Sequence, residues 1–312
     1  SIYSIIELRQ KIEKLVKSSN FKKNIFVSNQ NFANIITILS LKKIKNLKTI
    51  LIDRNHLDEL NYSKNWISFL KNKIILFLIK MTYKKADAIV GISKILANDL
   101  SKFIKKKVLI IYNPALDGKI YKKVSNKIKL PKTILNKKIL LNVGFFENQK
   151  DQITILKAFT LLRKEFKNIH LILIGRGSKY KELKNFVKLR ELNKYVSFFT
   201  NIDNPNIFYK ISNLFILSSK YEGFGNVLVE AMKNNCPVIT SNCKSGPMEI
   251  IDNGKYGDYF SVGDFVSLKD KVKKHLKNES RLKKKAISSK KHLRKFNLKN
   301  NKLSFDKLFN SI

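Results

Sequence analysis

The sequence predicts an α/β protein with parallel sheets and two domains. Short apolar runs that suit buried strands alternate along the chain with segments whose apolar residues recur at helical spacing, which is the order of βαβ units. The 312 residues suffice for two domains at a soft average of about 150 residues each. A hydrophobic content of 44% supports packed cores and excludes a disordered basic protein.

The first part of the chain is expected to alternate strands and helices up to a linker. Strands are expected at residues 24–27, 48–52, 86–90 and 108–112, and helices at 32–41, 66–83 and 93–103. Ser93 suits the N-cap of the last of these helices, and Asn113-Pro114 stops the last strand. The segment 115–132 is polar and Lys-rich and contains Pro131, which is typical of a linker.

The second part repeats the same alternation. Strands are expected at 139–143, 169–174, 196–199, 214–217 and 238–240. Helices are expected from about Asp151, at 179–189, after Asn226 and from Pro247, and the chain from Phe265 onward reads as helical and very basic. Glu249, in the first turn after Pro247, is expected to act as a capping residue.

Lysine gives the chain a formal net charge of +40. A composition bias on solvated faces accounts for most of this charge, and attraction to an anionic membrane surface is a use for the rest. We expect no nucleic-acid partner, because no recognition module or stacking platform is present. The basic, strongly apolar helix at 66–83 suits either a membrane surface or packing within its own domain, and packing is favoured.

The sequence shows no pattern of a membrane-spanning segment, a signal peptide or a metal centre. No apolar run reaches the ~20 residues of a membrane span, and the start has neither a signal-peptide pattern nor an initiator Met, which is typical of a fragment or a processed product. Cys236 and Cys243 have no metal or redox spacing, so we expect buried free thiols in a reducing compartment, with a disulfide left open.

The most informative segment is the run from Tyr221 to Glu230, YEGFGNVLVE. A buried strand precedes it and apolar residues at helical spacing follow, which puts Glu222 on a strand-to-helix turn and Glu230 two turns into the helix. A helix N-terminus attracts anions, and glycines let them approach the backbone. Carboxylates on either side of a bound diphosphate suit the ribose and sugar of a nucleotide sugar, although any α/β protein can carry two solvated glutamates here.

This run resembles the E-x7-E motif of retaining GT-B glycosyltransferases, most closely those of family 4, the glycosyl transferases group 1 of bacterial polysaccharide and lipid-linked oligosaccharide synthesis. The resemblance covers roughly residues 24–264. It implies two Rossmann-like domains, 1–131 on the acceptor side and 132–294 on the nucleotide-sugar side, with the C-terminal helix 295–312 joining the first. The first domain departs from the pattern, because the earlier strands and the Gly-rich acceptor loop of the family are absent.

The loop from Gly144 to Asp151 resembles the family loop G-R-L-x-x-x-K-D, in which the Arg and Lys bind the donor diphosphate. Lys150 matches, but Phe145 stands where Arg is usual. A phenyl ring cannot replace a bidentate cation, so the helix N-terminus at Asn226 or another cation must compensate. The simpler alternative is a surface lysine ahead of a helix.

The resemblance extends to further donor-binding residues and to one turn of the first domain. Gly175 belongs to a glycine pair beside the nucleotide, and Ile202 lies near the base. The expected donor contacts also include Gly144, Gly223, Phe224, Gly225, Asn226 and Glu230. Arg54 and His56 follow the strand at 48–52, at a strand end where α/β proteins bind ligands. Contact with the transferred sugar or acceptor and a structural role are equally weighted for these two.

The function that the resemblance implies is retaining transfer of a hexosyl group from an NDP-sugar to a glycan or polyprenyl-diphosphate-linked acceptor, in cell-surface polysaccharide or lipopolysaccharide synthesis. Glu222 would position the transferred sugar, Glu230 would hold the ribose, and Lys150 with the helix N-terminus would neutralise the diphosphate, without a metal or other cofactor. The expected place is the cytoplasm, with a peripheral position on the membrane left open. Two alternatives stay open: a non-catalytic nucleotide-sugar binder, and a basic nucleic-acid-binding protein.

Overall fold

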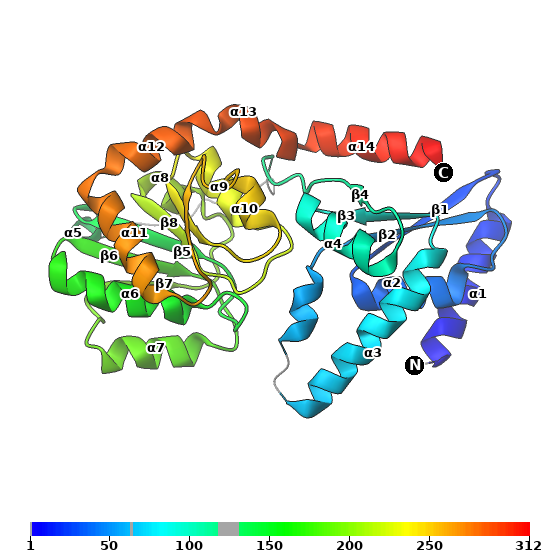
Figure 1. Ribbon diagram of the computed structural model, residues 1–312, viewed down its shortest axis with the longest axis horizontal. Coiled ribbons are helices and arrows are strands. Elements are labelled where there is room, and N and C mark those ends of the chain that lie inside the picture. Colours follow the sequence, from blue (N-terminus) through cyan, green and yellow to red (C-terminus); the bar gives the residue numbers. More distant parts are fainter. Residues whose placement is uncertain (1, 63–64, 118–130) are drawn as a thin grey trace. The chain divides into compact units, whose positions relative to one another are not determined.

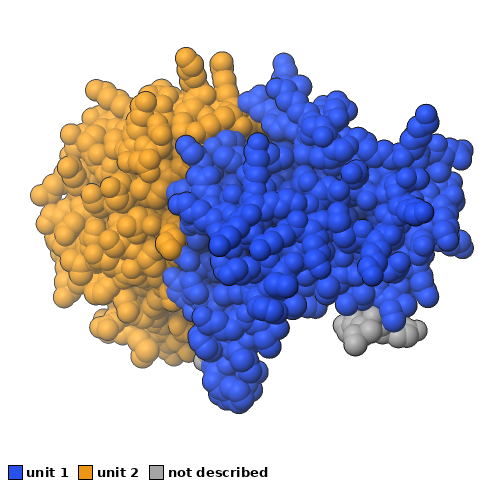
Figure 2. Space-filling view, turned by 45° about the vertical axis from the view of Figure 1, so that its right-hand side comes forward, with its two compact units in different colours: residues 1–113, 299–312 blue, residues 114–298 orange. Residues whose placement is uncertain are grey.

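The computed structural model describes residues 2–62, 65–117 and 131–312, so most of the expected linker at 115–132 lies outside the described residues. The chain divides into two compact units (Figure 2). Unit 1 comprises residues 1–113 and 299–312, and unit 2 comprises residues 114–298. The domain boundaries expected at 131 and 294 remain a prediction.

Unit 1 contains one parallel sheet in the order β1-β2-β3-β4 (Figure 1). Its elements are α1 (Ile2–Ser18), β1 (Asn24–Asn29), α2 (Asn31–Leu41), β2 (Leu47–Asp53), η1 (Leu57–Asn61), α3 (Trp66–Thr82), η2 (Tyr83–Lys85), β3 (Ala88–Gly91), α4 (Lys94–Ile104), β4 (Leu109–Ile110) and most of α14 (Leu298–Ser311). Apolar residues of α2, α3 and α4 form one core with Leu51 and Ile89 of the sheet. The predicted strands and helices are present, although the strand expected at 108–112 spans only Leu109–Ile110, and α1 and η1 were not foreseen.

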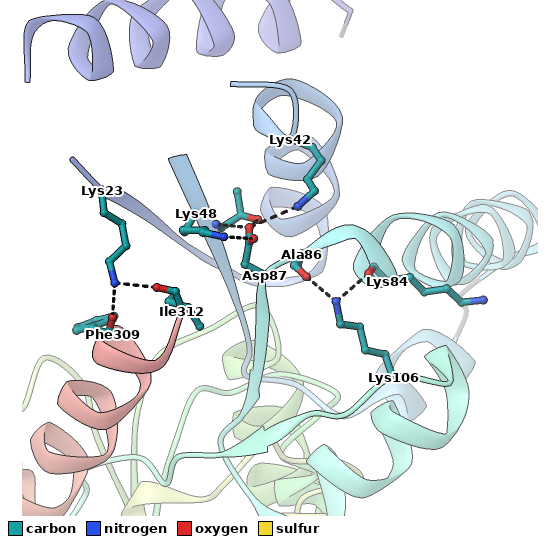
Figure 3. Close-up of polar contacts among 10 residues, drawn as sticks. Lys23, Lys42, Lys48, Lys84, Ala86, Asp87, Lys106, Phe309 and Ile312 are labelled. Atoms are coloured by element: carbon teal, nitrogen blue, oxygen red, sulfur yellow. Dashed lines mark hydrogen bonds and ion pairs between the residues drawn. The ribbon is translucent and has the colours of Figure 1, made fainter. Parts of the chain in front are cut away.

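Helix α14 returns from the far end of the sequence to unit 1. The Lys23 amine donates to the carbonyl oxygens of Phe309 and Ile312 at 2.9 and 2.7 Å (Figure 3). Asn301 of the same helix donates from Nδ2 to the carbonyl of Tyr112 at 2.8 Å. A cation suits the carbonyl-rich C-terminus of a helix, so these contacts explain why α14 belongs with unit 1.

Lys42, Lys48 and Lys106 make polar contacts near the amino ends of β2 and β3 in unit 1 (Figure 3). Asp87, just before β3, accepts from the N–H and hydroxyl of Thr49 at 2.9 and 3.0 Å and pairs with Lys48 and Lys42 at 3.4 and 3.5 Å. Burial alone would raise the pKa of Asp87, but these partners outweigh it and lower the pKa. Lys106 donates to two backbone carbonyls of the adjacent turn. These cations are therefore structural, at the edge opposite the one where parallel sheets bind ligands.

Unit 2 contains a six-stranded parallel sheet in the order β10-β9-β8-β5-β6-β7. Its elements are α5 (Lys132–Leu135), β5 (Lys138–Val143), α6 (Gln152–Glu165), β6 (Ile169–Ile174), α7 (Tyr180–Leu189), β7 (Val196–Phe199), α8 (Asn206–Ile211), β8 (Leu214–Leu217), α9 (Asn226–Lys233), β9 (Val238–Ser241), α10 (Gly246–Ile250), β10 (Asp258–Phe260), α11 (Phe265–Lys277), α12 (Glu279–Ser288), α13 (Lys290–Leu293) and η3 (Arg294–Phe296). The five predicted strands are confirmed to within about a residue, and β10 and α8 were missed.

The sheet of unit 2 is covered on both faces, as an all-parallel sheet requires. Residues of α6, α7 and α11 pack with Leu140, Leu171 and Ile216 into one core (Figure 1). On the other face, Phe215 of β8 meets Tyr209 of α8 with ring centroids 5.6 Å apart. The two Rossmann-like sets of parallel strands confirm the predicted α/β class.

Helix α12 closes the β10 edge of the sheet through ion pairs. Arg281 donates from both terminal nitrogens to the carboxylate of Asp258, and the Lys285 amine lies 2.9 Å from Oδ1 of the same group. Burial alone would raise the pKa of Asp258, but hydrogen bonds from the two cations lower the pKa to about 2. Helix α12 is thereby held on the sheet of unit 2.

Candidate active site

The predicted donor-binding segments meet at the carboxyl edge of the unit 2 sheet. Neighbouring strands β8, β5 and β6 are followed by the loops that carry Glu222, Lys150 and Gly175. Because carboxyl ends of parallel strands share one edge, segments far apart in the sequence gather there. Ile202 follows β7 at the end of the same edge and is half-buried.

Lys150 and Glu222 form an ion pair at the centre of this edge. The Lys150 amine lies 2.5 Å from Oε1 of Glu222, across 72 residues of sequence. The Lys150 side chain is 17% exposed and that of Glu222 is 7% exposed. Both charges are therefore largely shielded from water. In such surroundings the pair interacts strongly, and removing one partner destabilises the fold.

Glu222 is held by further hydrogen bonds around its turn. The Ser219 hydroxyl donates to the same Oε1 at 2.6 Å, and the Ser245 hydroxyl donates to the carbonyl of Gly223 at 2.7 Å. Oε2 of Glu222 accepts no hydrogen bond from the described part of the chain. One oxygen of a fixed carboxylate is thus left to accept a hydroxyl group of a ligand.

The glycine turn leads directly into helix α9. Gly225 has a φ of +100°, a left-handed conformation that favours glycine, and the helix begins at the exposed Asn226. Phe224 is buried, with its ring 5.0 Å from that of Phe296. A Cβ on Gly246 would lie 2.0 Å from the carbonyl oxygen of Phe224, so the start of α10 presses against the turn. The turn is therefore rigid, and it presents the N–H groups of α9 at the sheet edge.

Glu230 lies nearer the start of α9 than the sequence indicated. It is the fifth residue of a helix that begins at Asn226, which is a little more than one turn rather than two. The prediction counted from the turn, where the backbone is not yet helical. The Tyr209 hydroxyl donates to Oε2 of Glu230 at 3.0 Å, and this half-buried carboxylate is thereby oriented from α8.

The two glycine loops after β5 and β6 touch each other. A Cβ on Gly175 would lie 2.0 Å from the carbonyl oxygen of Gly144, so only glycine fits there. The Gly144 N–H donates to the carbonyl of Ile174 at 2.9 Å, and the Phe146 N–H donates to that of Arg176 at 2.9 Å. The loops therefore form one continuous backbone surface beside Lys150.

Arg176 and Lys220, which the sequence did not single out as ligand-binding cations, belong to loops beside this surface. Arg176 stands between the two glycines of its loop and is exposed. The Lys220 N–H donates to the carbonyl of Gln149 at 2.8 Å, next to Lys150. Phe145, which stands where the family carries Arg, is 60% exposed. Nothing in the local sequence of either cation marked it, because only the strand order brings their loops together.

In unit 1, the two candidates of the β2 turn differ in their surroundings. His56 is buried and caps η1: Nδ1 accepts the Asp58 N–H at 3.1 Å, and Nε2 lies 2.9 Å from a carboxylate oxygen of Asp99. Both ring nitrogens are thus engaged in local structure. Arg54 is exposed and donates from Nε to the side-chain oxygen of Asn29 at 3.1 Å, a bond that does not use its terminal nitrogens. Asp53, just before it, is buried, and burial raises its pKa to about 7.

The described residues contain no group of three or more His, Cys, Asp or Glu side chains that suits a metal ion. Cys236 and Cys243 are buried free thiols, as the sequence predicted, and burial raises the pKa of each to about 12.

Solved structures show which fold this chain has. A sucrose-phosphate synthase from Thermosynechococcus elongatus superposes with a TM-score of 0.79 at 18% identity, over 98% of this chain and 78% of that one. TarM of Staphylococcus aureus, in a crystal structure with UDP, gives a TM-score of 0.75 at 18% identity, over 97% of this chain and 58% of that one. The fold is that of the GT-B glycosyltransferases.

The family follows from sequence comparison. The model of the glycosyl transferases group 1 matches residues 125–292. An uncharacterised glycosyltransferase of Methanocaldococcus jannaschii is 32% identical over 268 residues, which is 80% of this chain and 62% of that protein. The N-acetylgalactosamine-N,N'-diacetylbacillosaminyl-diphospho-undecaprenol 4-alpha-N-acetylgalactosaminyltransferase of Campylobacter jejuni is 29% identical over 82% of this chain and 70% of that protein. The chain belongs to the glycosyl transferases group 1, and it spans about two thirds of the length of these relatives.

Proposed function

We propose that this protein is a retaining glycosyltransferase that moves a sugar from an NDP-sugar to a glycan or lipid-linked acceptor in cell-surface polysaccharide synthesis. The observation that carries the proposal is the buried ion pair between Lys150 and Glu222, 2.5 Å apart at the carboxyl edge of the sheet. The pair lies where the loop before α6 meets the turn before α9. A cation and a carboxylate held together beside a helix N-terminus match the diphosphate and the hydroxyl groups of a nucleotide sugar.

In this proposal the donor exchanges partners with the ion pair. The Lys150 amine moves from Oε1 of Glu222 to the diphosphate, and Oε2 of Glu222 accepts a hydroxyl group of the transferred sugar. Glu230, oriented by Tyr209, holds the ribose hydroxyls. The N–H groups at the start of α9 receive the remaining diphosphate charge, so the residues themselves neutralise the leaving group without a metal.

The transfer step breaks the bond between the anomeric carbon and the diphosphate oxygen and forms one to the acceptor hydroxyl oxygen. The hydroxyl proton leaves with the nucleoside diphosphate, on the face where the acceptor attacks. Glu222 acts by positioning and does not form a covalent intermediate. In unit 1, Arg54 is the candidate for acceptor contact, because it is exposed and its bond to Asn29 does not use its terminal nitrogens, while His56 supports the turn.

We assign the missing second cation of the diphosphate site to Arg176 and Lys220. Phe145 supplies no charge at the position where the family has Arg. Arg176 and Lys220 belong to loops whose backbones hydrogen-bond to the Gly144–Lys150 loop on either side. Arg176→Ala is expected to weaken UDP binding, whereas Phe145→Ala is expected to leave it nearly unchanged.

The lipid-linked acceptor is supported by the relatives. The name of the Campylobacter jejuni enzyme includes a diphospho-undecaprenol acceptor, and a Staphylococcus aureus relative is named for capsular polysaccharide biosynthesis. A polyprenyl-diphosphate acceptor would place the protein at the cytoplasmic face of a membrane, as a peripheral protein.

The test is UDP binding by calorimetry, followed by release of nucleoside diphosphate from UDP-, GDP- and ADP-sugars. Lys150→Met is expected to abolish both, and Lys164→Met is the matched control because this exposed lysine lies on α6. Nucleotide binding without turnover, with any donor or acceptor, would select the alternative of a non-catalytic binder, which Phe145 favours. Binding by Lys150→Met equal to that of the unaltered protein would overturn the site assignment.

A further inference from the structure

Helix α3 of unit 1 carries an apolar stripe that faces solvent. Trp66, Leu70, Ile74, Phe77 and Met81 are each more than half exposed, and Trp66 reaches 74%. At 100° per residue these five side chains fall within about 80° of arc. They therefore form one continuous strip about 22 Å long at 1.5 Å per residue.

The opposite side of α3 is packed in its own domain. Ile79 is fully buried in the core that α3 shares with α2 and α4, and Thr82 is also buried. A helix cap fixes the start, with Asn65 and Ser68 bonded to each other's backbone N–H. The helix is thus a formed element with two apolar faces, one used by the core and one facing outward.

The outward face is cationic as well as apolar. Lys73 and Lys80 are exposed beside the stripe, and the Lys73 amine lies 5.3 Å from the ring centroid of Phe69. The helix contains no Asp or Glu. Lys84 and Lys85 follow in η2 and are also exposed.

We infer that the α3 stripe, Trp66, Leu70, Ile74, Phe77 and Met81 with Lys73 and Lys80, binds an anionic lipid bilayer in the plane of its surface. Apolar side chains enter the headgroup region while the flanking lysines meet anionic lipid phosphates, and tryptophan favours that boundary. Pairing with a second copy is disfavoured, because it would bring identical rows of lysines together without any acid between them. In the described part of the chain no helix is long and apolar enough to cross the bilayer.

This inference adds a surface to the proposed peripheral location, and it is measured without nucleotide or acceptor. If the protein transfers no sugar, the inference that α3 binds a bilayer still holds. If α3 binds no bilayer, the proposed donor site is not affected.

Trp66 makes a direct test possible, because it is the single tryptophan of the chain. The full chain is mixed with vesicles of phosphatidylglycerol and phosphatidylcholine, or of phosphatidylcholine alone. We expect a blue shift of the emission and quenching by brominated acyl chains with the anionic vesicles only, weakened by salt. Unchanged emission with anionic vesicles that bind the protein would overturn the inference.

Paired variants identify the surface in a vesicle flotation assay. Leu70→Ser with Phe77→Ser is expected to weaken binding about tenfold or more, because both side chains lose their contact with lipid. The matched control, Leu189→Ser with Phe21→Ser, changes the same residue types at sites that are 82% and 77% exposed off α3, and should bind normally. Equal flotation of the two pairs would refute the assignment.

The charge is tested in the same way. Lys73→Gln with Lys80→Gln is expected to weaken binding to anionic vesicles several-fold, and Lys283→Gln with Lys284→Gln, on exposed positions of α12, should have a smaller effect. Sedimentation velocity is run alongside. Self-association that the α3 substitutions abolish, without vesicle binding, would assign the stripe to a protein interface instead.

Discussion

Replacing Lys150 by Met is expected to destabilise unit 2 through the carboxylate that it leaves behind. The amine and Oε1 of Glu222 are 2.5 Å apart, and the two side chains are 17% and 7% exposed. Removing one partner of a buried ion pair costs about 3–5 kcal/mol. The Ser219 hydroxyl still donates to Oε1, and the partly exposed side chains admit some water, so we expect the free energy of unfolding to fall by about 3 kcal/mol.

A double-mutant cycle separates the ion pair from the packing of its side chains. In Lys150→Met with Glu222→Gln no buried charge is left unpaired, so most of the stability should return. We expect a coupling free energy of about 2 kcal/mol. Lys164→Met, which removes an exposed lysine of α6, should change stability by less than about 0.5 kcal/mol.

The measurement must report on unit 2 alone. Amides of β5 and β8 that exchange with solvent only when the whole unit unfolds report the free energy of unfolding of unit 2. A stabilising role of the ion pair is refuted if the two single substitutions add without coupling, or if Lys150→Met is as stable as Lys164→Met. The same samples with UDP test function: Lys150→Met should lose the ligand-dependent stabilisation that the unaltered protein shows.

Three further predictions concern the scaffold around the site. Asp258→Asn should destabilise unit 2 by about 2 kcal/mol at pH 7, because the folded pKa of about 2 lies below the unfolded value of 3.8; the difference, measured by hydrogen exchange, should shrink as pH falls from about 4 to 2. Asp53 has the opposite sign: its pKa of about 7 means that unit 1 loses stability as pH rises from about 4 to 7, by at most about 4 kcal/mol. Asp53→Asn should remove that slope in denaturant titrations followed by Trp66 fluorescence, and a persistent slope would contradict this. Gly175→Ala should destabilise unit 2 by about 2 kcal/mol and weaken UDP binding, because its Cβ would lie 2.0 Å from the Gly144 carbonyl oxygen. Gly144→Ala, whose Cβ would meet nothing nearer than the Lys150 side chain at 3.7 Å, should be milder in both assays.

The strands of unit 2 could be predicted because a parallel strand buried on both faces is a continuous apolar run. Ile169–Ile174 is buried at all six positions and was found with both ends correct. Strand β10 and helix α8 escaped because each is short and partly polar, so that tertiary contacts rather than local pattern stabilise them. Helix α1 is amphipathic but contains no strong start or stop signal.

The candidate site was predictable in its parts but not in its assembly. The glycine turn and the two glutamates mark a strand-to-helix junction, and their spacing carries the family resemblance. The contact between Lys150 and Glu222 across 72 residues was not readable, because it depends on β5 and β8 being neighbours in the sheet. The cations Arg176 and Lys220 were missed for the same reason.

The sequence by itself determined the fold class, the order of strands along the chain and the family, because these follow from local apolar periodicity and from short motifs. Tertiary structure alone decided which loops share the carboxyl edge of the sheet and which side chains face water. Helix α3 makes the difference plain: its basic, strongly apolar sequence suits either a membrane surface or packing within its own domain, and from sequence packing is favoured. Only the packed domain shows that Ile79 faces the core while Trp66 and Phe77 face outward, because burial depends on neighbours that are distant in sequence.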